Sequence, residues 1–274
     1  MTAARRIVVT GATEGIGWQT ALELLRLGHE VVVHGRSEAR AAEAATRLAK
    51  ASGRPAPATC SADLASMKQV RAMGASLLER FARVDVLINN AGVFATERVE
   101  TEDGFELTVA VNHLSHFLLT HLLLPALRQS DQGRVVHVAS GVHGSGRVDL
   151  ADLQMRERWD GYEAYASSKL MNVLFSNELA RRLHDTRITS NSLHPGVIAT
   201  KLLRAGFGGG GASAERGART SVLCATDPAL ADVTGAYFSD GRRAEPSPRS
   251  RDRALAKGLY ELSCTLTGVS PLPG

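Results

Sequence analysis

The stretch Ile7-Val8-Val9-Thr10-Gly11-Ala12-Thr13-Glu14-Gly15-Ile16-Gly17 decides the fold. It begins as a β-branched run, turns through three glycines, and leads into a helical apolar pattern that ends at Gly28. A strand, a glycine turn and a helix in this order place backbone N–H groups and a helix N-terminus against a pyrophosphate. The spacing G-x3-G-x-G departs from the common G-x-G-x-x-G, so a plain turn between a strand and a helix is the alternative.

Apolar runs of the same character recur along the chain, with helical patterns between them. The second run, residues 31–34, is close enough to the first to be its parallel neighbour after a right-handed crossover. Alternation of this kind predicts a doubly wound α/β fold with a mostly parallel, seven-stranded sheet and helices on both faces. Ligands of such sheets bind at the carboxyl ends of the strands. The other predicted strands lie within residues 58–64, 84–92, 133–140, 188–196 and 235–239.

Composition is typical of a soluble globular protein. The chain has 274 residues, of which 44% are apolar and 22% charged, enough for one substantial core. No uninterrupted apolar run approaches the ~18 to 20 residues needed to cross a bilayer, and the start of the sequence leaves no room for a signal-peptide apolar region. The 32 basic and 28 acidic residues are dispersed, which gives little support to nucleic-acid binding. We expect a cytoplasmic protein without a membrane or nucleic-acid partner.

Metal and disulfide chemistry find no support in the sequence. His113 and His116 share a helix face, but His121 is further along and no acid completes a ligand set. The cysteines are odd in number and scattered, so no disulfide framework or zinc site is indicated. A basic cluster within residues 242–253 contains two prolines and is expected to be a solvated surface loop. The cysteines are Cys60, Cys224 and Cys264.

The end of the second strand bears on the choice of nucleotide. Where NAD enzymes commonly place an acid for the ribose 2′-hydroxyl, this chain has Arg36. An arginine suits a 2′-phosphate and cannot accept from a ribose hydroxyl, so NADP(H) is preferred over NAD(H). Arg40, one helical turn on, is a candidate second cation, whereas Glu14 works against the preference if it turns toward the adenosine end. Asp63, which ends the third strand, is placed to contact adenine.

Tyr165 and Lys169 lie in a helical pattern that runs on to Leu183, four residues apart and therefore on one face. A phenol titrates near ~10 in water. A cation one turn away favours phenolate, which proton exchange near neutrality requires. Taken alone, this spacing is typical of solvated surface pairs, so its meaning depends on the residues around it.

Polar residues at two further strand ends supply that context. Asn90 and Gly92 follow the fourth strand and Ser140 follows the fifth, at the sheet edge where the glycine turn also lies. Asn112 lies in an apolar helix expected from residue 102 to about 127. Such an asparagine is usually a hydrogen-bonded core residue or a surface residue, but it can also bind a water beside a catalytic lysine.

With these motifs together, the chain resembles the short-chain dehydrogenase/reductase family, which has the Rossmann fold, over nearly its whole length. The motifs occur in the expected order and on the expected elements. They are residues 10–17, Asp63-Leu64, residues 89–92, Asn112, Ser140, residues 165–169, Pro195-Gly196 and Thr200.

Within that family the chain looks most like the retinol dehydrogenase and WW-domain oxidoreductase branch. The sequence shows neither the membrane anchor of many vertebrate retinol dehydrogenases nor a WW module, so we expect neither retinol as substrate nor a scaffold role. The supporting stretches are residues 111–120, 168–175, 193–197 and 259–263.

The resemblance implies a role for each site residue. Tyr165 would be the general acid in reduction and the base in oxidation, while Ser140 would hydrogen-bond the substrate oxygen. Lys169 would hold the ribose hydroxyls and bias Tyr165 toward phenolate. Asn112 would position a water that links Lys169 to solvent. The residues implied in cofactor binding are Gly11, Thr13, Glu14, Gly15, Ile16, Gly17, Arg36, Arg40, Asp63, Leu64, Asn90, Ala91, Gly92, Tyr165, Lys169, Pro195, Gly196, Val197 and Thr200.

These roles predict an NADP(H)-dependent oxidoreductase that interconverts a carbonyl and an alcohol. The chain is expected to form a single domain, with a cofactor-binding part at about residues 1–140 and a catalytic part at about 140–274. A catalytically silent NADP(H)-binding redox sensor on the same fold is the alternative. In many relatives the helices around residues 102–128 and 161–184 pair between subunits, which implies a homodimer or homotetramer.

The substrate pocket is expected from residues 141–160 and 201–214. These loops hold no charge cluster, which favours a small, largely apolar compound. His143, Trp159 and Phe207 are candidates to line the pocket, with an ordinary surface position as the equal alternative. A run of four glycines predicts a flexible flap over residues 202–214.

Overall fold

Eight strands form a sheet in the computed structural model, which describes residues 4–273 apart from the side chains of Leu203 and Phe207. The strand order is β3-β2-β1-β4-β5-β6-β7-β8, parallel throughout except between β7 and β8. The strands are β1 (Arg6–Val9), β2 (Glu30–Gly35), β3 (Ala58–Ser61), β4 (Val86–Asn89), β5 (Gly133–Val138), β6 (Ile188–His194), β7 (Tyr237–Ser239) and β8 (Arg242–Ala244).

The predicted doubly wound fold with seven parallel strands is confirmed, and β8 adds an eighth strand that the sequence analysis missed. β7 and β8 form a hairpin through Asp240 (φ 49°) and Gly241 (φ 71°). Two central residues with positive φ are the mark of the tight hairpin turn that Asp-Gly favours. The loop expected over residues 242–253 is therefore wrong in part, because it contains β8 and the 3₁₀ helix η4 (Pro248–Arg251).

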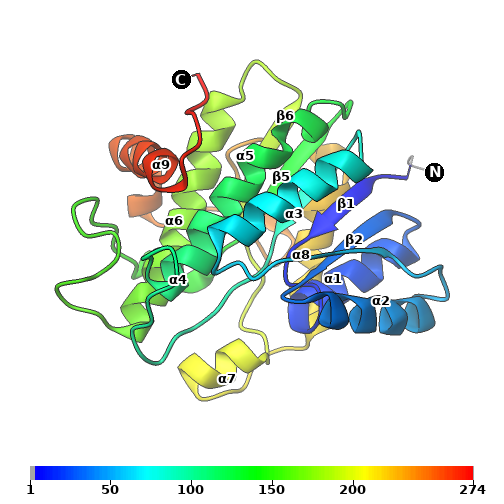
Figure 1. Ribbon diagram of the computed structural model, residues 1–274, viewed down its shortest axis with the longest axis horizontal. Helices are drawn as coiled ribbons and strands as arrows, with labels where there is room; N and C mark the ends of the chain where they lie inside the picture. Colours follow the sequence, from blue (N-terminus) through cyan, green and yellow to red (C-terminus); the bar gives the residue numbers. More distant parts are fainter. Residues whose placement is uncertain (1–3, 274) are drawn as a thin grey trace.

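Helices cover both faces of the sheet, because side chains of successive strand residues point to opposite sides. Ile7 and Val9 belong to one hydrophobic core, while Val8 belongs to the other. Figure 1 shows the two helical layers on either side of the sheet. The first layer contains α1 (Gly15–Arg26), α2 (Glu38–Ser52) and α8 (Ala214–Thr226). The second contains α3 (Met67–Arg80), α5 (Ser115–Leu127) and α6 (Gly161–Arg182), with α9 (Arg253–Thr267) packed outside α6.

The helix expected from residue 102 begins later, at Leu107, where the Glu106 side chain accepts from the Val109 amide. It runs through α4 (Leu107–Val109) and a π-helical turn, η1 (Ala110–Leu114), into α5. The stretch Leu107–Leu127 is long and apolar enough to cross a bilayer, and it is the one such helix in the described part of the chain. Since 83% of its apolar window is buried inside the fold, it has the character of a core helix.

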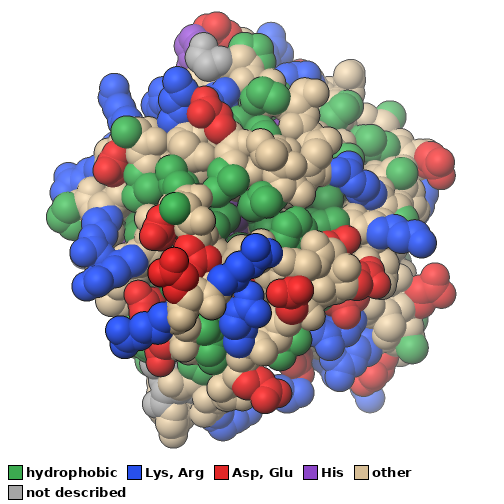
Figure 2. Space-filling view, turned by 60° about the vertical axis from the view of Figure 1, so that its left-hand side comes forward, with side chains coloured by type: hydrophobic (Ala, Val, Ile, Leu, Met, Phe, Trp, Pro, Cys, Tyr) green, Lys and Arg blue, Asp and Glu red, His purple; other side chains and the backbone are tan. Residues whose placement is uncertain are grey.

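Charges of both signs are interspersed on the surface. On the face that Figure 2 shows, Lys and Arg side chains lie among Asp and Glu, and hydrophobic side chains form a band across the middle of the face. This distribution agrees with a net charge of only +4 from many ionised groups.

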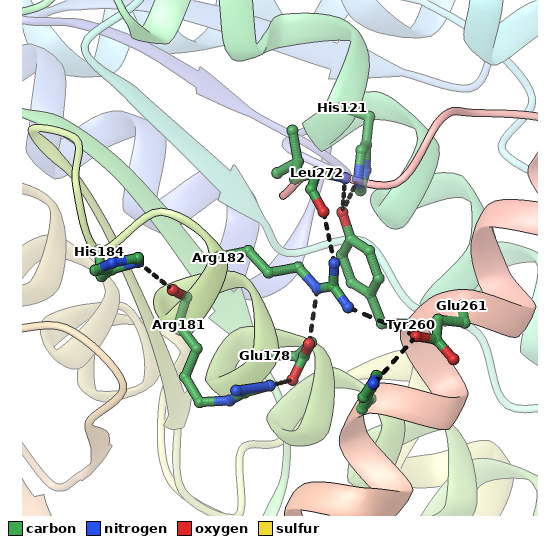
Figure 3. Close-up of polar contacts among 9 residues, drawn as sticks. His121, Glu178, Arg181, Arg182, His184, Tyr260, Glu261 and Leu272 are labelled. Carbon is green, nitrogen blue, oxygen red and sulfur yellow. Dashed lines mark hydrogen bonds and ion pairs between the residues drawn. The ribbon is translucent and has the colours of Figure 1, made fainter. Parts of the chain in front are cut away.

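A buried ion cluster fastens the C-terminal part to α6 (Figure 3). The Glu178 side chain has no exposed surface and accepts from Arg181 and Arg182. The Arg182 guanidinium lies 4.0 Å from the centroid of the Tyr260 ring in α9 and donates to the Leu272 carbonyl at 2.6 Å. The Tyr260 hydroxyl accepts from the Leu272 amide at 3.1 Å. Arg182 therefore joins α6, α9 and the chain that follows α9.

Replacing Arg182 with Met should lower the free energy of unfolding by about 3 kcal/mol, because it leaves the buried Glu178 carboxylate with less compensation. Urea denaturation would measure the loss. The control is Arg26→Met, whose ion pair with Glu23 is exposed and whose loss should cost less than about 1 kcal/mol. Equal effects of the two substitutions would contradict this account of the cluster.

Candidate active site

A cavity of about 820 Å³ opens at the carboxyl ends of the parallel strands. Every residue predicted to bind the cofactor lines this cavity, and so does Ser140. Asn112 does not line it. Residues that were far apart in the sequence thus lie at one edge of the sheet.

The glycine turn is joined directly to the end of β4. The buried Thr10 hydroxyl accepts from the backbone amides of Asn90 and Ala91 at 2.8 and 3.0 Å, and the Asn90 side chain donates to the Thr10 carbonyl. A Cβ on Gly17 would lie 2.3 Å from the Gly11 carbonyl oxygen. Only glycine fits there, which explains the third glycine of the turn.

Two buried histidines, which the sequence analysis did not assign to the site, hold the same region. His34 Nδ1 accepts from the Gly11 amide at 3.0 Å, and its Nε2 donates to the Ala62 carbonyl. His116 Nδ1 donates to the Asn112 carbonyl, so its Nε2 accepts from the Thr10 hydroxyl at 2.9 Å. Burial lowers the pKa of His34 to about 4 and of His116 to about 3. Both imidazoles are therefore neutral.

The predicted adenosine end carries exposed charges. The Arg36 side chain is 61% exposed, and its guanidinium lies 3.6 Å from the Asp63 carboxylate. Arg40 lines the cavity nearby. Glu14 turns toward α7 (Lys201–Phe207), where its carboxylate pairs with the Lys201 ammonium at 2.5 Å. The negative charge of Glu14 is thus compensated by a residue of the predicted flap.

Tyr165 and Ser140 meet at the other end of the cavity. Tyr165 lies on α6, whose N-terminus is capped by the Asp160 side chain. Ser140 follows β5 and precedes the 3₁₀ helix η2 (Gly141–Gly144). Both side chains line the cavity, and hydrogen bonding from Ser140 acts to lower the pKa of the Tyr165 phenol. The structure therefore brings together the two hydroxyl groups that the sequence analysis had assigned to the substrate oxygen.

Lys169 lies beside this pair, with its ammonium 5.5 Å from the centroid of the Tyr165 ring and donating to the Val138 carbonyl at 3.0 Å. Burial lowers the pKa of Lys169 to about 8. Burial also raises the pKa of Tyr165 to about 12, although the hydrogen bond with Ser140 acts in the opposite direction. Burial thus favours the neutral phenol in the chain alone, and the predicted bias toward phenolate stays a prediction.

Asn112 is fully buried on the π-helical turn. Its Oδ1 accepts from the Val93 amide at 2.8 Å, and its Nδ2 donates to the Val93 carbonyl and the Ser168 hydroxyl. The side chain therefore ties the turn after β4 to α6, next to Lys169. Its predicted role beside the lysine stays a prediction.

The glycine-rich segment has a defined backbone. Residues 208–211 have φ values of 78°, 97°, 88° and 113°, a region that side chains disfavour, which accounts for four glycines in a row. After the glycines the chain comes back beside the residues that precede α7, where the Ala212 amide donates to the Val197 carbonyl at 2.8 Å. The short helix α7 precedes it, beyond the carboxyl ends of the strands (Figure 1).

The candidate pocket residues outside the motifs differ from expectation. His143 and Trp159 do not line the cavity, and the Phe207 side chain lies outside the described residues. Phe94 does not line the cavity either, but it packs beside Tyr165: the two ring centroids are 5.7 Å apart, and a Cβ on Gly206 of α7 would lie 2.6 Å from the Phe94 ring. The sequence analysis missed Phe94, and its place directly after the Asn-Asn-Ala-Gly-Val run was the available signal.

No group of three or more His, Cys, Asp and Glu side chains suited to a metal occurs within residues 4–273. The three histidines of the expected helix have separate partners. His113 contacts the Ser263 hydroxyl and His121 the Tyr260 hydroxyl, each at 2.8 Å, while His116 contacts Thr10.

The sequence profile of the short chain dehydrogenase family matches residues 5–207. Together with the strand order and the cavity, this match shows that the chain belongs to the short chain dehydrogenase family, whose members are oxidoreductases.

Two curated relatives are retinol dehydrogenases, which confirms the resemblance to that branch. Retinol dehydrogenase 14 of Mus musculus is 39% identical over 292 residues, covering 97% of this chain and 86% of that protein. Retinol dehydrogenase 12 of Homo sapiens is also 39% identical, covering 96% and 86%.

Solved structures have the same fold. An uncharacterized protein of Mycobacterium paratuberculosis superposes with a TM-score of 0.84 at 34% identity, covering 99% of this chain and 96% of the other. A short chain dehydrogenase of Salmonella enterica serovar Typhi gives a TM-score of 0.69 at 25% identity, covering 87% and 96%.

Replacing Gly17 with Ala should weaken NADPH binding by about tenfold or more, which corresponds to about 1.4 kcal/mol, because the added carbon forces the turn away from β4. Fluorescence titration with NADPH would measure the change. Gly144→Ala is the matched control, since its nearest contact would be an ordinary 3.9 Å. Wild-type affinity in the Gly17 variant would contradict the tight fit of the turn.

Proposed function

We propose that this chain is an NADP(H)-dependent oxidoreductase that interconverts a ketone or aldehyde and an alcohol by hydride transfer. The observation that carries the proposal is that Tyr165 and Ser140 line one cavity that also reaches the glycine turn. Two hydroxyl groups at one point suit a carbonyl oxygen on which negative charge develops. The names of the two retinol dehydrogenases agree with alcohol and carbonyl chemistry.

The residues present fit a dinucleotide. The Glu14 side chain does not cap α1, so the first amides of that helix are left for an anion, and the space beside Gly17 is too tight for a side chain. When bound, the nicotinamide would supply or accept the hydride. The glycine turn would bind the pyrophosphate. Asp63 and Leu64 would contact adenine, while residues 90–92 and 195–200 would hold the nicotinamide half.

Tyr165 would donate a proton to the substrate oxygen during reduction and accept one during oxidation. With its pKa raised to about 12 by burial, the phenol is protonated at neutral pH, the form that reduction needs. Oxidation needs phenolate, so Lys169 would have to promote deprotonation. Ser140 would supply the second hydrogen bond to the same oxygen.

Lys169 would hold the ribose hydroxyls, and Asn112 would position a water beside it. A Cβ built on Gly92 would lie 3.4 Å from Lys169 Nζ and 3.5 Å from Asn112 Oδ1. Both atoms thus reach the same point next to Gly92, which supports the proposed pairing of Asn112 with Lys169.

The preference for NADP(H) rests on Arg36. Its exposed guanidinium at the end of β2 suits a 2′-phosphate, with Arg40 as a second cation. The competing effect of Glu14 is weakened, because that carboxylate pairs with Lys201.

Replacing Arg36 with Asp should shift the ratio of kcat/KM values for NADPH and NADH toward NADH by about tenfold or more, because the new carboxylate repels a 2′-phosphate and accepts from a ribose hydroxyl. Steady-state kinetics with both cofactors would measure the ratio. Arg128→Asp makes the same charge change on an exposed position outside the cavity. An unchanged ratio in the Arg36 variant would refute the assignment.

Replacing Tyr165 with Phe should remove nearly all turnover while NADPH binding changes by less than about twofold, because only the acid–base hydroxyl is lost. A panel of hexanal, decanal, benzaldehyde and cyclohexanone, followed at the NADPH absorbance, would test this. Tyr162→Phe is the control, since Tyr162 is 43% exposed and its hydroxyl contacts Ser145. A Tyr165 variant that retained normal activity would sink the mechanism.

The panel of carbonyl compounds also distinguishes the oxidoreductase from the redox-sensor alternative. A small, largely apolar carbonyl compound is the proposed substrate, because Val93, Val142 and Leu202 line the cavity near the predicted pocket. NADPH binding without turnover of any panel compound would favour the redox-sensor alternative.

We propose a cytoplasmic enzyme whose assembly does not use α6. In the single chain, every residue of α6 from Ala164 to Ser176 is buried, and α9 packs against this helix. A second subunit could pair along that stretch only by displacing α9. A homodimer or homotetramer would therefore form through other surfaces.

A further inference from the structure

His143 connects the loop after Ser140 to a distant part of the chain. It lies on η2, is 5% exposed, and has a backbone group at each ring nitrogen. Nδ1 is 2.7 Å from the Ser140 carbonyl oxygen, and Nε2 is 3.0 Å from the Ser247 amide nitrogen. Since a carbonyl only accepts and an amide only donates, Nδ1 carries the proton and Nε2 does not. The ring is thus held as one neutral tautomer between two backbone segments.

The segment at the far side of this bridge is itself fixed. The Ser250 carbonyl accepts from the Asn177 side chain on α6 at 2.9 Å. The Arg249 guanidinium donates to the Gly146 carbonyl at 3.0 Å, which ties the end of the Ser140 loop to the same segment. The His143 ring also packs 5.0 Å from the Tyr237 ring, centroid to centroid. Part of the region expected to be a surface loop therefore supports the loop that follows Ser140.

We propose that His143 is a positioning residue for Ser140. Its Nδ1–H fixes the Ser140 carbonyl, and the Ser247 amide enforces the tautomer that provides this N–H. The Ser140 side chain, which lines the same cavity as Tyr165, is thereby held in place for the proposed reaction. The catalytic part of the inference rests on the proposed function, but the bridge itself does not. An ordered supporting group matters because a displacement of about 1 Å at a reacting group can slow turnover up to about 100-fold.

The bridge is tested by nitrogen NMR on protein labelled with 15N-histidine, with the His143 signals assigned from their loss in His143→Asn. The expected result is a protonated Nδ1 and an unprotonated Nε2. In Ser247→Pro the amide donor is deleted while the backbone is preserved, because φ of Ser247 is already −59°. The Nε2 signal should then lose its hydrogen-bond shift, because no donor faces that nitrogen, while the Ser140 carbonyl still requires the proton on Nδ1. A wild-type ring protonated at Nε2 would overturn the proposal.

The consequence for Ser140 is tested by turnover of the panel named above with NADPH. His143→Ala should lower kcat by about tenfold or more with NADPH affinity unchanged, because the Ser140 carbonyl loses the shorter of its two hydrogen bonds and keeps the one from the residue 143 amide at 3.1 Å. His143→Asn should recover most of kcat, since an amide N–H at the same distance from the backbone reaches the Ser140 carbonyl. If His143 only filled space, the Asn side-chain N–H would not be expected to restore kcat.

Ser247 provides a matched pair. Ser247→Pro should lower kcat several-fold, whereas Ser247→Ala retains the amide and should match the wild type. Equal kcat values in these two variants, or a wild-type kcat in His143→Ala, would overturn the positioning role. If the wild type turns over no panel compound, the proposed function and the catalytic consequence fail, and the nitrogen NMR result alone decides whether the bridge exists.

Discussion

The edge of the sheet that carries the cavity depends on the hydroxyl of Thr10. This buried group accepts from the amides of Asn90 and Ala91, and it also contacts His116, whose other nitrogen donates to the Asn112 carbonyl. The ends of β1 and β4 and the π-helical turn are thereby joined at the place where the strand order changes direction. In a doubly wound sheet that place is the ligand crevice. One small side chain therefore sets the relative positions of the predicted phosphate-binding turn and the predicted catalytic helix.

The cavity shows how far sequence reasoning reaches in this fold. Alternating apolar runs and glycines locate the strand ends, and parallel strands bring those ends to one edge, so Gly17, Ser140 and Tyr165 could be assigned to one cavity. The hairpin of β7 and β8 was also within reach, because Asp240-Gly241 is a turn signal. The partners of His143 were not, since Ser247 lies 104 residues away and no local pattern joins them. The pKa of Tyr165 depends on burial, which spacing does not reveal.

The C-terminal third of the chain also holds other parts of the fold in place. Arg182 joins α6 to α9 and to the chain beyond it, while the segment with Ser247 and Arg249 contacts the loop after Ser140. Helix α6 carries Tyr165 at one end and Glu178 near the other. Tyr165 and the segment that supports the Ser140 loop are thus attached to the same helix, the segment through the bond from Asn177 to the Ser250 carbonyl.

The neutral histidines give the fold a limited tolerance for acid. His34 and His116 each use one ring nitrogen as an acceptor, and protonation would convert that acceptor into a donor facing another donor. Their pKa values, about 4 and about 3, lie below the ordinary 6.5, so the unfolded chain binds more protons than the folded chain in this range. The stability that His34 and His116 contribute is fully present above about pH 6.5 and is lost as the pH falls toward 3. The contacts of the glycine turn and the π-helical turn should therefore weaken as the medium becomes acidic.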